Sequence, residues 1–559
     1  MAKKSDKKRN ILTLRLKVEP YQEHILEKRL NICRMIYNSM VNVIKKQINK
    51  LNHDLEYKQE MKNLINIKEE LDKINKEINK SSLDKINIKE LKSKQTEIKI
   101  EYNKISKKLD NLRKKYYLTE YDMYKLITPI YKKYNCHIQS HIAQDISLRV
   151  WKAVDKYLFK EGKTIHYKKY GDYHSLTSTD DEQIIFKGDY IQFHEHSNKK
   201  KIKLKNDASK DKKQKSIDKK QLNDKFKLKL KIHYNKKQNT EYEKLFLENV
   251  KIVQNRIKRK FIKNKYVYYV DIVYEGTPIS IHKKGNTLGN GNIGIDIGTQ
   301  TIAYTTDNEV KLLELANKVQ DIEIEKHNIQ RYMDRSRRSM NPNNFNEDGT
   351  IKKQGRKKVK WEYSKKYIKA KNKLKNILRK QADIRTLQHW ELANHIVKQG
   401  NIINIEKMNF SALQKRSKKT TINKKTGKYN SKKRFGKSLA NKAPAKFIEI
   451  LNYKISSLGG ILNKCDTKEL KASQYNHIEN KFIKKDLNNR WNKLNYKDQN
   501  ILIQRDLYSA YLLKYVNEDL NTYNKEMLNN NFDRFIELYN KEIKRIKSTK
   551  LTKALTNIL

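Results

Sequence analysis

The chain has 559 residues, of which 125 are Lys or Arg and 63 are Asp or Glu, so its formal net charge is +62. A globular protein with this much unbalanced charge repels itself unless a polyanion neutralises it, so the composition predicts a nucleic-acid partner. The three cysteines are isolated, which excludes a disulfide framework and a Cys-rich zinc site, and no apolar run of about 18 residues exists to form a transmembrane helix.

Charge alone does not identify an activity, because a ribosomal-type or histone-like binder has a similar composition. The length predicts roughly three or four domains. The basic N-terminal residues lack the apolar region of a secretory signal, so we expect a cytoplasmic protein.

The first third of the chain predicts one strand followed by helices. Residues 10–18 alternate apolar and polar side chains, and the pattern becomes helical after Pro20. From about 43 to 116 the chain is rich in Lys and Glu, with Ile or Leu every three or four residues, which predicts a long antiparallel helical hairpin. This hairpin is either a solvated coiled coil or a basic surface that lies along a nucleic-acid duplex. A further helix is predicted to end near 159.

Short alternating segments follow Gly162 and are separated by Gly, Asn and Asp turns, which predicts a small β-barrel. The charged stretch 199–221 is predicted to be a mobile loop, and 285–292 a linker. Aromatic side chains of the helical and barrel segments are expected mostly to pack in the core, with stacking on unpaired bases as the alternative; examples are Tyr116, Tyr117 and Tyr121.

A first candidate catalytic residue is Asp296, which lies in the apolar strand sequence GIDIG (294–298). A buried strand tolerates a carboxylate only when a metal ion or a proton neutralises it. Gly298 is expected to leave backbone room beside this carboxylate. The following residues predict a second strand and a turn at Asp307-Asn308.

Two further carboxylates occupy similar positions. Glu406 ends the apolar segment INIE, and an amphipathic segment that is predicted to be a crossover helix precedes it. Asp506 is predicted to share one stripe of a helix with Leu502, Ala510 and Leu513 and so to point inward. Three such carboxylates predict a site for two Mg²⁺ ions that hydrolyses phosphodiesters, because hard cations prefer oxygen ligands.

The ordered motifs GIDIG, INIEKMNF and QRDLYSAYLL resemble those of the TnpB family of transposon-encoded RNA-guided nucleases and their descendants, the compact type V CRISPR effectors. Weaker similarity is scattered from about residue 10 to 515. The resemblance implies that Asp296, Glu406 and Asp506 are a metal-binding catalytic triad and that Arg505 is the nucleic-acid-binding Arg before the last Asp. It also implies a guide RNA and a double-stranded DNA target as partners, with a short motif beside the target.

The resemblance further implies an α/β multidomain fold with a RNase H-like (RuvC-type) nuclease domain, an N-terminal OB-like β-barrel and a helical recognition lobe. We expect these domains at the following residues: the barrel (wedge) at 1–30 and 160–290, the helical lobe at 31–159, the nuclease domain at 291–460 and 500–520, a lid that resembles a degenerate zinc ribbon at 461–499, and a basic helical tail at 521–559.

The lid departs from the family pattern. The positions of the four expected cysteines are Asn476, Glu479, Tyr496 and Gln499, which do not form a tetrahedral zinc site. We therefore expect no zinc, with the lid held by packing of residues such as Trp491. The neighbouring His477 is expected at the surface or against nucleic acid.

A predicted helix at 318–340 is expected to lie beside the nuclease cleft and to contact phosphates; its candidate residues are Arg331, Arg335, Arg337 and Arg338. Two alternative functions remain: a non-cleaving RNA-guided DNA-binding repressor, and a RNase H-like recombinase or transposase that acts without RNA. A transposon and a CRISPR context are both open, as are the oligomeric state and the role of the tail.

Overall fold

The structure is a computed structural model, and it describes residues 8–556 apart from several internal segments. Those segments are 79–84, 135–136, 160, 180–182, 195–226, 234–239, 280–286, 348, 353–358, 418–420, 423–426, 428–429, 431–434, 485–488 and 549–552. The predicted loop 199–221 therefore lies outside the described residues. The chain divides into an N-terminal unit, Met1–Thr277, and a C-terminal unit, Pro278–Leu559, and both combine helices with sheets.

The N-terminal unit contains a seven-stranded sheet in the order β2-β6-β7-β1-β5-β4-β3, and all of its strand pairs are antiparallel. The strands are β1 (Arg9–Lys17), β2 (Ser175–Thr177), β3 (Ile184–Phe186), β4 (Tyr190–His194), β5 (Lys227–His233), β6 (Ile252–Ile262) and β7 (Lys265–Glu275). Among the described residues, strand pairing does not close this sheet into the predicted barrel. A side chain instead connects edge strand β3 to β6, the strand next to the other edge, because the Asn255 amide of β6 donates to the Ile184 carbonyl of β3 at 2.7 Å.

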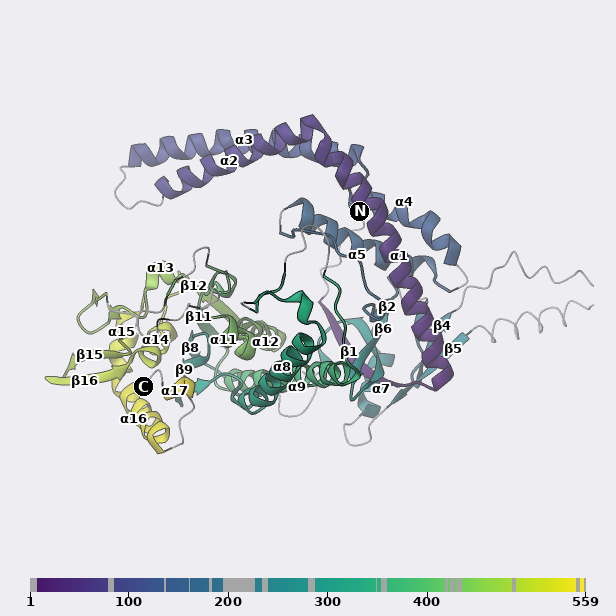
Figure 1. The fold of residues 1–559 in the computed structure, drawn as a ribbon. Coiled ribbons are helices and arrows are strands. Elements are labelled where there is room, and N and C mark those ends of the chain that lie inside the picture. Colours follow the sequence, from purple (N-terminus) through teal and green to yellow (C-terminus); the bar gives the residue numbers. More distant parts are fainter. Residues whose placement is uncertain are drawn as a thin grey trace, which may run out of the picture. The chain divides into compact units, whose positions relative to one another are not determined.

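Helices make up the rest of the N-terminal unit, and Figure 1 shows α2 and α3 running side by side as the predicted long hairpin. Their bounds are α1 (Pro20–His53), α2 (Leu55–Ile78), α3 (Lys85–Lys115), α4 (Glu120–Tyr131), the 3-10 turn η1 (Lys132–Tyr134), α5 (Ser140–Leu158) and α7 (Thr240–Glu248). The first helix begins at Pro20 because Glu19 and Gln22 form a capping box around it. Residues 20–30 therefore belong to a helix, as the pattern after Pro20 predicts, although the expected domain bounds grouped them with the barrel.

The alternating segment GKTIHYKKYGDYHSL (162–176) was expected to form a strand, but it does so only at its end, where β2 begins at Ser175, and residues 162–171 have no regular structure. Asn38 of α1 binds it instead: the backbone N–H of Lys168 donates to the Asn38 side chain at 2.8 Å, and the Asn38 amide donates back to the Lys168 carbonyl at 2.9 Å. A side-chain clamp thus replaces the strand pairing that the alternating pattern suggested.

The C-terminal unit is built on a five-stranded sheet in the order β10-β9-β8-β11-β12. The strands β8 (Asn292–Ile297), β9 (Thr301–Thr305) and β10 (Val310–Glu314) pair antiparallel, whereas β11 (Ile402–Glu406) and β12 (Ile461–Cys465) run parallel to β8. The first strand, the hairpin and the strand that ends at Glu406 lie where the sequence predicts them.

Helices cover both faces of this sheet. Ile293, Ile295 and Ile297 pack with residues of α9 (Lys365–Val397) and α12 (Pro444–Ser457), whereas the face that carries Gly294 meets α14 (Arg505–Lys514). The other elements are the 3-10 turns η4 (Asn317–Val319) and η5 (Pro342–Asn344) and the helices α8 (Gln320–Met340), α10 (Phe410–Leu413), α11 (Gly436–Lys442), α13 (Thr467–Leu470), α15 (Lys525–Asn530), α16 (Phe532–Ser548) and α17 (Lys553–Thr556).

Two small hairpins precede α14, one of β13 (Tyr475–Asn476) with β14 (Lys481–Phe482) and one of β15 (Trp491–Tyr496) with β16 (Gln499–Gln504). The strand β16 corrects the predicted helical stripe, since Leu502 lies in it and is exposed. The helix starts only at Arg505. Leu507 through Lys514 are all buried, so the helix has no single apolar face.

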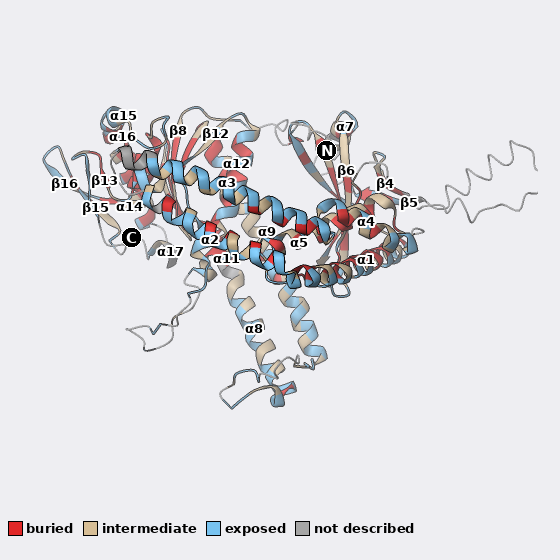
Figure 2. Cartoon of the chain, turned by 90° about the horizontal axis from the view of Figure 1, so that it is seen from above, coloured by how far each residue is buried: buried red, intermediate tan, exposed pale blue. Residues whose placement is uncertain are grey.

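The predicted basic tail folds onto the C-terminal unit. Its helix α16 buries Glu542, which accepts from the Leu312 backbone N–H of β10 at 2.9 Å and pairs with Arg545 at 2.6 Å. Figure 2 shows exposed residues along much of α8, in contrast to the buried strand β8. Within the described residues, no helix is long and apolar enough to cross a membrane.

Candidate active site

The sheet of the C-terminal unit places Asp296 and Glu406 next to each other, at the ends of neighbouring parallel strands. The parallel strands β8 and β11 pair in the register Asn292–Ile402 through Ile295–Ile405, and the two carboxylates come one residue after the last of these pairs. Residues that are opposite each other in a sheet project from the same face. Both carboxylates therefore leave the sheet on the face that meets α14.

A glycine lets α14 approach that face. A Cβ at Gly294 would lie 1.9 Å from the Ala510 carbonyl oxygen and 2.3 Å from the Lys514 nitrogen, which are both backbone atoms of α14. The helix therefore rests directly on the strand, two residues before Asp296. By contrast, a Cβ at Gly298 would first meet the Thr301 side chain at 3.4 Å. Gly294 thus makes room for α14, and Gly298, which was expected to leave room beside the carboxylate, lines the same cavity as Asp296.

A buried amide chain holds the same helix. Asn404 projects from β11 on the face of Glu406 and donates to the Leu513 carbonyl of α14 at 3.1 Å, while it accepts from Asn463 of β12 at 3.0 Å. Asn404 is 2% exposed, so loss of either partner would leave a buried polar group unsatisfied. Sequence reasoning did not single out this residue, although an Asn within an apolar strand is itself a signal.

All three predicted carboxylates line one cavity of about 540 Å³. Asp296 comes from the end of β8, Glu406 from the end of β11, and Asp506 from the first turn of α14. Arg490 and Arg505 line the same cavity. The Arg505 guanidinium donates to Asp506 Oδ1 from Nε at 3.3 Å and from Nη2 at 3.2 Å, and it reaches the Asn489 carbonyl at 3.3 Å.

The pocket is short of positive charge. Burial, and then repulsion from Asp506 and Glu406, raises the pKa of Asp296 well above its ordinary value, although Arg505 and Arg490 act in the opposite direction. Burial and then Asp506 raise the pKa of Glu406 to about 7. The two arginines therefore do not compensate the three carboxylates. The same carboxylates attract either protons or a further cation.

In the described part of the chain, no group of three or more His, Cys, Asp and Glu side chains, the three carboxylates included, is arranged as a cage that could hold a metal ion. Mg²⁺ does not require such a cage, because it keeps several water ligands and is commonly held by one or two carboxylates. The donor set of this pocket, three carboxylates with two raised pKa values, fits a hard divalent cation.

The lid has no metal-ligand set at the expected cysteine positions. The Asn476 side-chain oxygen accepts from the backbone N–H groups of Ile478 at 3.1 Å and Glu479 at 3.4 Å, which closes the turn between β13 and β14. Tyr496 lies at the end of β15 and Gln499 begins β16. An Asn side chain thus holds the first hairpin turn.

The expectation for His477 is wrong, because this residue is 4% exposed. Its Nδ1 lies 2.5 Å from the Tyr508 hydroxyl, and its ring packs edge-on against Phe532 at 4.6 Å. Tyr496 packs against the same Phe532 ring at 4.8 Å. Aromatic side chains from the tail therefore support the lid, whereas the predicted anchor Trp491 is only half-buried.

The tail also contacts the junction between the lid and α14. Gln504 is fully buried and caps α14 by accepting from the Leu507 backbone N–H at 2.8 Å. The Tyr539 hydroxyl of α16 accepts from the Gln504 backbone N–H at 3.1 Å and donates to the Leu502 carbonyl at 3.3 Å. This junction immediately precedes Arg505 and Asp506.

The four arginines predicted to contact phosphates lie on α8 and do not line the carboxylate cavity. Arg337 and Arg338 both pair with Asp334, at 2.7 and 2.9 Å. Arg337 lies over the Trp361 ring, and Arg338 lies over the Phe345 ring. These two side chains thus hold the end of α8, whereas Arg331 and Arg335 are exposed.

Of the three tyrosines singled out in the helical segment, Tyr117 and Tyr121 are exposed, and only Tyr116 is half-buried, with its hydroxyl donating to Asp54 at 2.6 Å. Exposed Tyr167 carries Lys45 at 4.1 Å from its ring centroid. The N-terminal unit therefore presents tyrosine and lysine side chains together at its surface.

No protein-family model matches the sequence, and no curated protein matches it. Among solved structures, one described as the cryo-EM structure of a Cas12f1–sgRNA–target DNA complex has a TM-score of 0.40 and 11% identity, covering 90% of this chain and 98% of that one. A second, described as the cryo-EM structure of a CRISPR-Cas12f ternary complex, has a TM-score of 0.22 and 12% identity, covering 92% and 100%. TM-scores below 0.5 do not establish a common fold.

Proposed function

We propose that this protein is an RNA-guided DNA endonuclease whose C-terminal unit is a RNase H-like (RuvC-type) nuclease that cuts DNA at Asp296, Glu406 and Asp506. The observation that carries the proposal is the convergence of these three carboxylates, from two parallel strands and one helix, in a single cavity with two arginines. The strand order, with three antiparallel strands followed by two parallel ones, supports the RNase H-like assignment.

We propose that two Mg²⁺ ions bind in this cavity and that Asp296, Glu406 and Asp506 would hold them. When bound, the metal supplies charge that activates water and stabilises the leaving oxygen of a phosphodiester. Asp296 and Glu406 fix its position, since both project from rigid, adjacent strands.

The other residues of the pocket act on the nucleic acid. Arg505 and Arg490 supply positive charge beside the carboxylates, so we expect them to orient the phosphate that is cut. In the structure Arg505 rests on Asp506 and is available to exchange this contact for a phosphate. The exposed Arg331 and Arg335 of α8 are proposed as additional phosphate contacts.

The role of RNA rests on the sequence motifs and on the charge. A net charge of +62 exceeds what the pocket needs and fits a protein that holds a long polyanion. The helical hairpin α2–α3 and the tyrosine–lysine surface of the N-terminal unit are proposed to hold a guide RNA and its hybrid with target DNA by backbone contacts. We propose that the lid needs no zinc, since Asn476 and aromatic packing hold it.

The test is cleavage of a plasmid that matches the RNA that co-purifies with the protein, in the presence of Mg²⁺. We expect cutting by the wild type, loss of cutting in Asp296→Asn and Glu406→Gln, and unchanged RNA content in both variants. Binding of the matched DNA without cutting by the wild type would instead indicate a non-cleaving repressor. Cutting that does not depend on RNA would indicate a recombinase or transposase.

Sequencing of the co-purified RNA separates the two biological contexts. An RNA with variable spacers at its end indicates a CRISPR effector, and an RNA that ends at a transposon boundary indicates a TnpB protein. If only degraded ribosomal fragments co-purify, the guided mechanism is wrong, and a basic RNase H-like nuclease or binder remains.

A further inference from the structure

A second cavity, of about 590 Å³, lies in the N-terminal unit, where the start of α2 faces the end of α5 and the residues after it. Its walls are apolar: Met61 and Ile65 come from α2, and Leu158 comes from α5. Two tyrosine rings complete the lining. The hydroxyl of Tyr57 interacts with Arg113, and that of Tyr157 accepts from the Asn52 amide at 3.3 Å.

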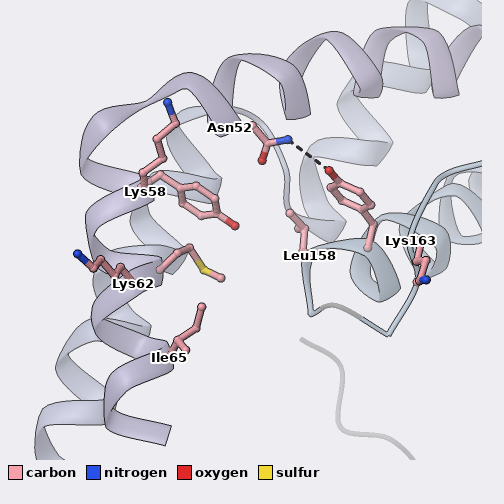
Figure 3. A pocket seen from close by; sticks show the side chains of 10 residues that line it. Asn52, Lys58, Lys62, Ile65, Leu158 and Lys163 are labelled. Carbon is pink, nitrogen blue, oxygen red and sulfur yellow. Dashed lines mark hydrogen bonds between the residues drawn. The ribbon is translucent and has the colours of Figure 1, made fainter. Parts of the chain in front are cut away.

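Three lysines border this cavity. Figure 3 shows Lys58 and Lys62 on α2, on the same helix as Ile65, with Lys163 on the opposite wall beside Leu158. All three are exposed, and no acidic residue lines the cavity. None of the three forms a salt bridge with another described residue. The cavity thus combines an aromatic and aliphatic interior with a cationic rim.

This combination fits one ligand chemistry. An unstacked nucleobase is a flat, largely apolar ring that stacks on tyrosine, and the strand that carries it has a phosphate on each side. The cavity volume falls within the range of small-molecule sites and accommodates one base. A lipid or an uncharged small molecule does not explain the three lysines around the entrance.

We infer that this cavity binds a single unpaired nucleotide of the bound RNA, with the base between Tyr57, Tyr157 and Ile65 and the flanking phosphates at Lys58, Lys62 and Lys163. RNA is the fitting source because a folded RNA holds a bulged or looped base at a fixed position, and recognition of RNA commonly uses such splayed bases. The inference rests on the proposed function only in that the protein carries an RNA.

The first measurement is the affinity of the protein for a single-stranded RNA. Its length is roughly 15 nucleotides, which spans one binding groove. The substitution Ile65→Trp fills the cavity without changing the charge, and we expect it to weaken RNA binding about 5- to 150-fold, the effect of losing one stacked base. The matched control is Ile11→Trp, which changes an exposed Ile of β1 outside both the cavity and the hairpin α2–α3. Equal affinities of the two variants would overturn the inference.

Charge is tested in the same way. Lys58→Glu with Lys62→Glu should lower the salt dependence of RNA binding by about 1.4 in log–log slope, the contribution of two contacts to a single strand. The control pair Lys544→Glu and Lys547→Glu lies on α16, outside the hairpin α2–α3, and removes the same charge at exposed positions. Equal slopes for the two double variants would show only a diffuse field effect and reject the site.

Ultraviolet crosslinking of the full chain with this RNA, and with DNA of the same sequence, identifies the strand. A ribonucleotide adduct on residues 57–65 or 157–163 supports the inference, whereas adducts from DNA alone, or none in these segments, contradict it. Neither measurement needs Mg²⁺ or cleavage. If the RNA crosslinks to these segments but the protein does not cut DNA, only the nuclease proposal is refuted. If the protein cuts matched DNA but no such crosslink forms, only the inference about this cavity is refuted.

Discussion

The hydroxyl of Tyr539 accepts a hydrogen bond from the backbone N–H of Gln504 at 3.1 Å, and so ties the tail helix α16 to the residue that caps α14. Gln504 precedes Asp506 by two residues, and both Gln504 and Tyr539 are buried. The tail, which the sequence left without a role, thus fixes the start of the helix that carries one of the three carboxylates.

Replacing Tyr539 by Phe should therefore lower activity more than binding. The variant leaves the buried Gln504 N–H without its partner, which costs about 1–3 kcal/mol of unfolding free energy. We expect a reduced cleavage rate with unchanged affinity for RNA and DNA, measured by single-turnover kinetics and filter binding. The control is Tyr332→Phe on the exposed helix α8. Equal loss of binding and cleavage in Tyr539→Phe would argue against a positioning role.

Gly294→Ala should disrupt the site much more than Gly298→Ala. The added Cβ meets the backbone of α14 at 1.9 Å in the first case and a threonine side chain at 3.4 Å in the second. We expect Gly294→Ala to lower the free energy of unfolding by about 1–3 kcal/mol or more and to abolish cleavage. Gly298→Ala should lower it by less than about 1 kcal/mol. Denaturant unfolding and cleavage assays check both, and equal effects would show that α14 does not rest on β8.

The carboxylate pocket should make the metal-free protein less stable as the pH rises. Because the pKa of Glu406 is about 7 in the folded state, above its ordinary value near 4.5, the folded state retains a proton that the unfolded state releases. Stability is therefore lost between about pH 4.5 and 7, by roughly 1–3 kcal/mol. Mg²⁺ should raise the melting temperature at about pH 8 and have little effect at about pH 5, where the raised pKa values keep protons on Asp296 and Glu406.

Asp296→Asn gives the complementary result. The substitution removes the most crowded charge, so the metal-free variant should melt above the wild type at about pH 8 while cleavage falls by at least about 1000-fold. Asp383→Asn, at an exposed pair with Arg379, is the control for a general charge effect. A variant that is both less stable and fully active would contradict the assignment of Asp296.

Two buried histidines should make the C-terminal unit sensitive to acid. Burial lowers the pKa of His389 and of His477 to about 4. The unfolded state therefore binds protons that the folded state does not, and stability is lost as the pH falls from about 6.5 to about 4, by up to about 3 kcal/mol for each residue. His477→Phe should reduce this loss, measured by unfolding across that range, whereas His327→Asn at an exposed site should not.

The sequence was sufficient to single out the three carboxylates that line one cavity and to predict the strands β8, β9 and β11, because Asp296 and Glu406 each lie in an apolar strand. It was not sufficient for features that depend on contacts distant in sequence. The closeness of Gly294 to α14, the burial of His477 and the link between Tyr539 and Gln504 join residues that no local pattern connects.

The same limit explains the errors in the N-terminal unit. The alternation in GKTIHYKKYG resembled a strand, but Asn38, more than 120 residues earlier, takes the backbone groups that a neighbouring strand would have paired. The predicted closed barrel depended on edge pairing, which the individual strands do not encode. Strand identity is local, whereas closure of a sheet is a property of the whole chain.

The link between α16 and α14 also sets an order of events during translation. Tyr539 is synthesised after Asp506, and at roughly 5–20 residues per second the intervening chain takes about 2–7 s to make. Throughout that interval the carboxylates of β8 and β11 are already on the nascent chain, while the start of α14 lacks its clamp. A ribosome-bound chain therefore carries all three carboxylates of the cavity before the contact that fixes the start of α14 exists, so the cavity is complete only after α16 has been synthesised.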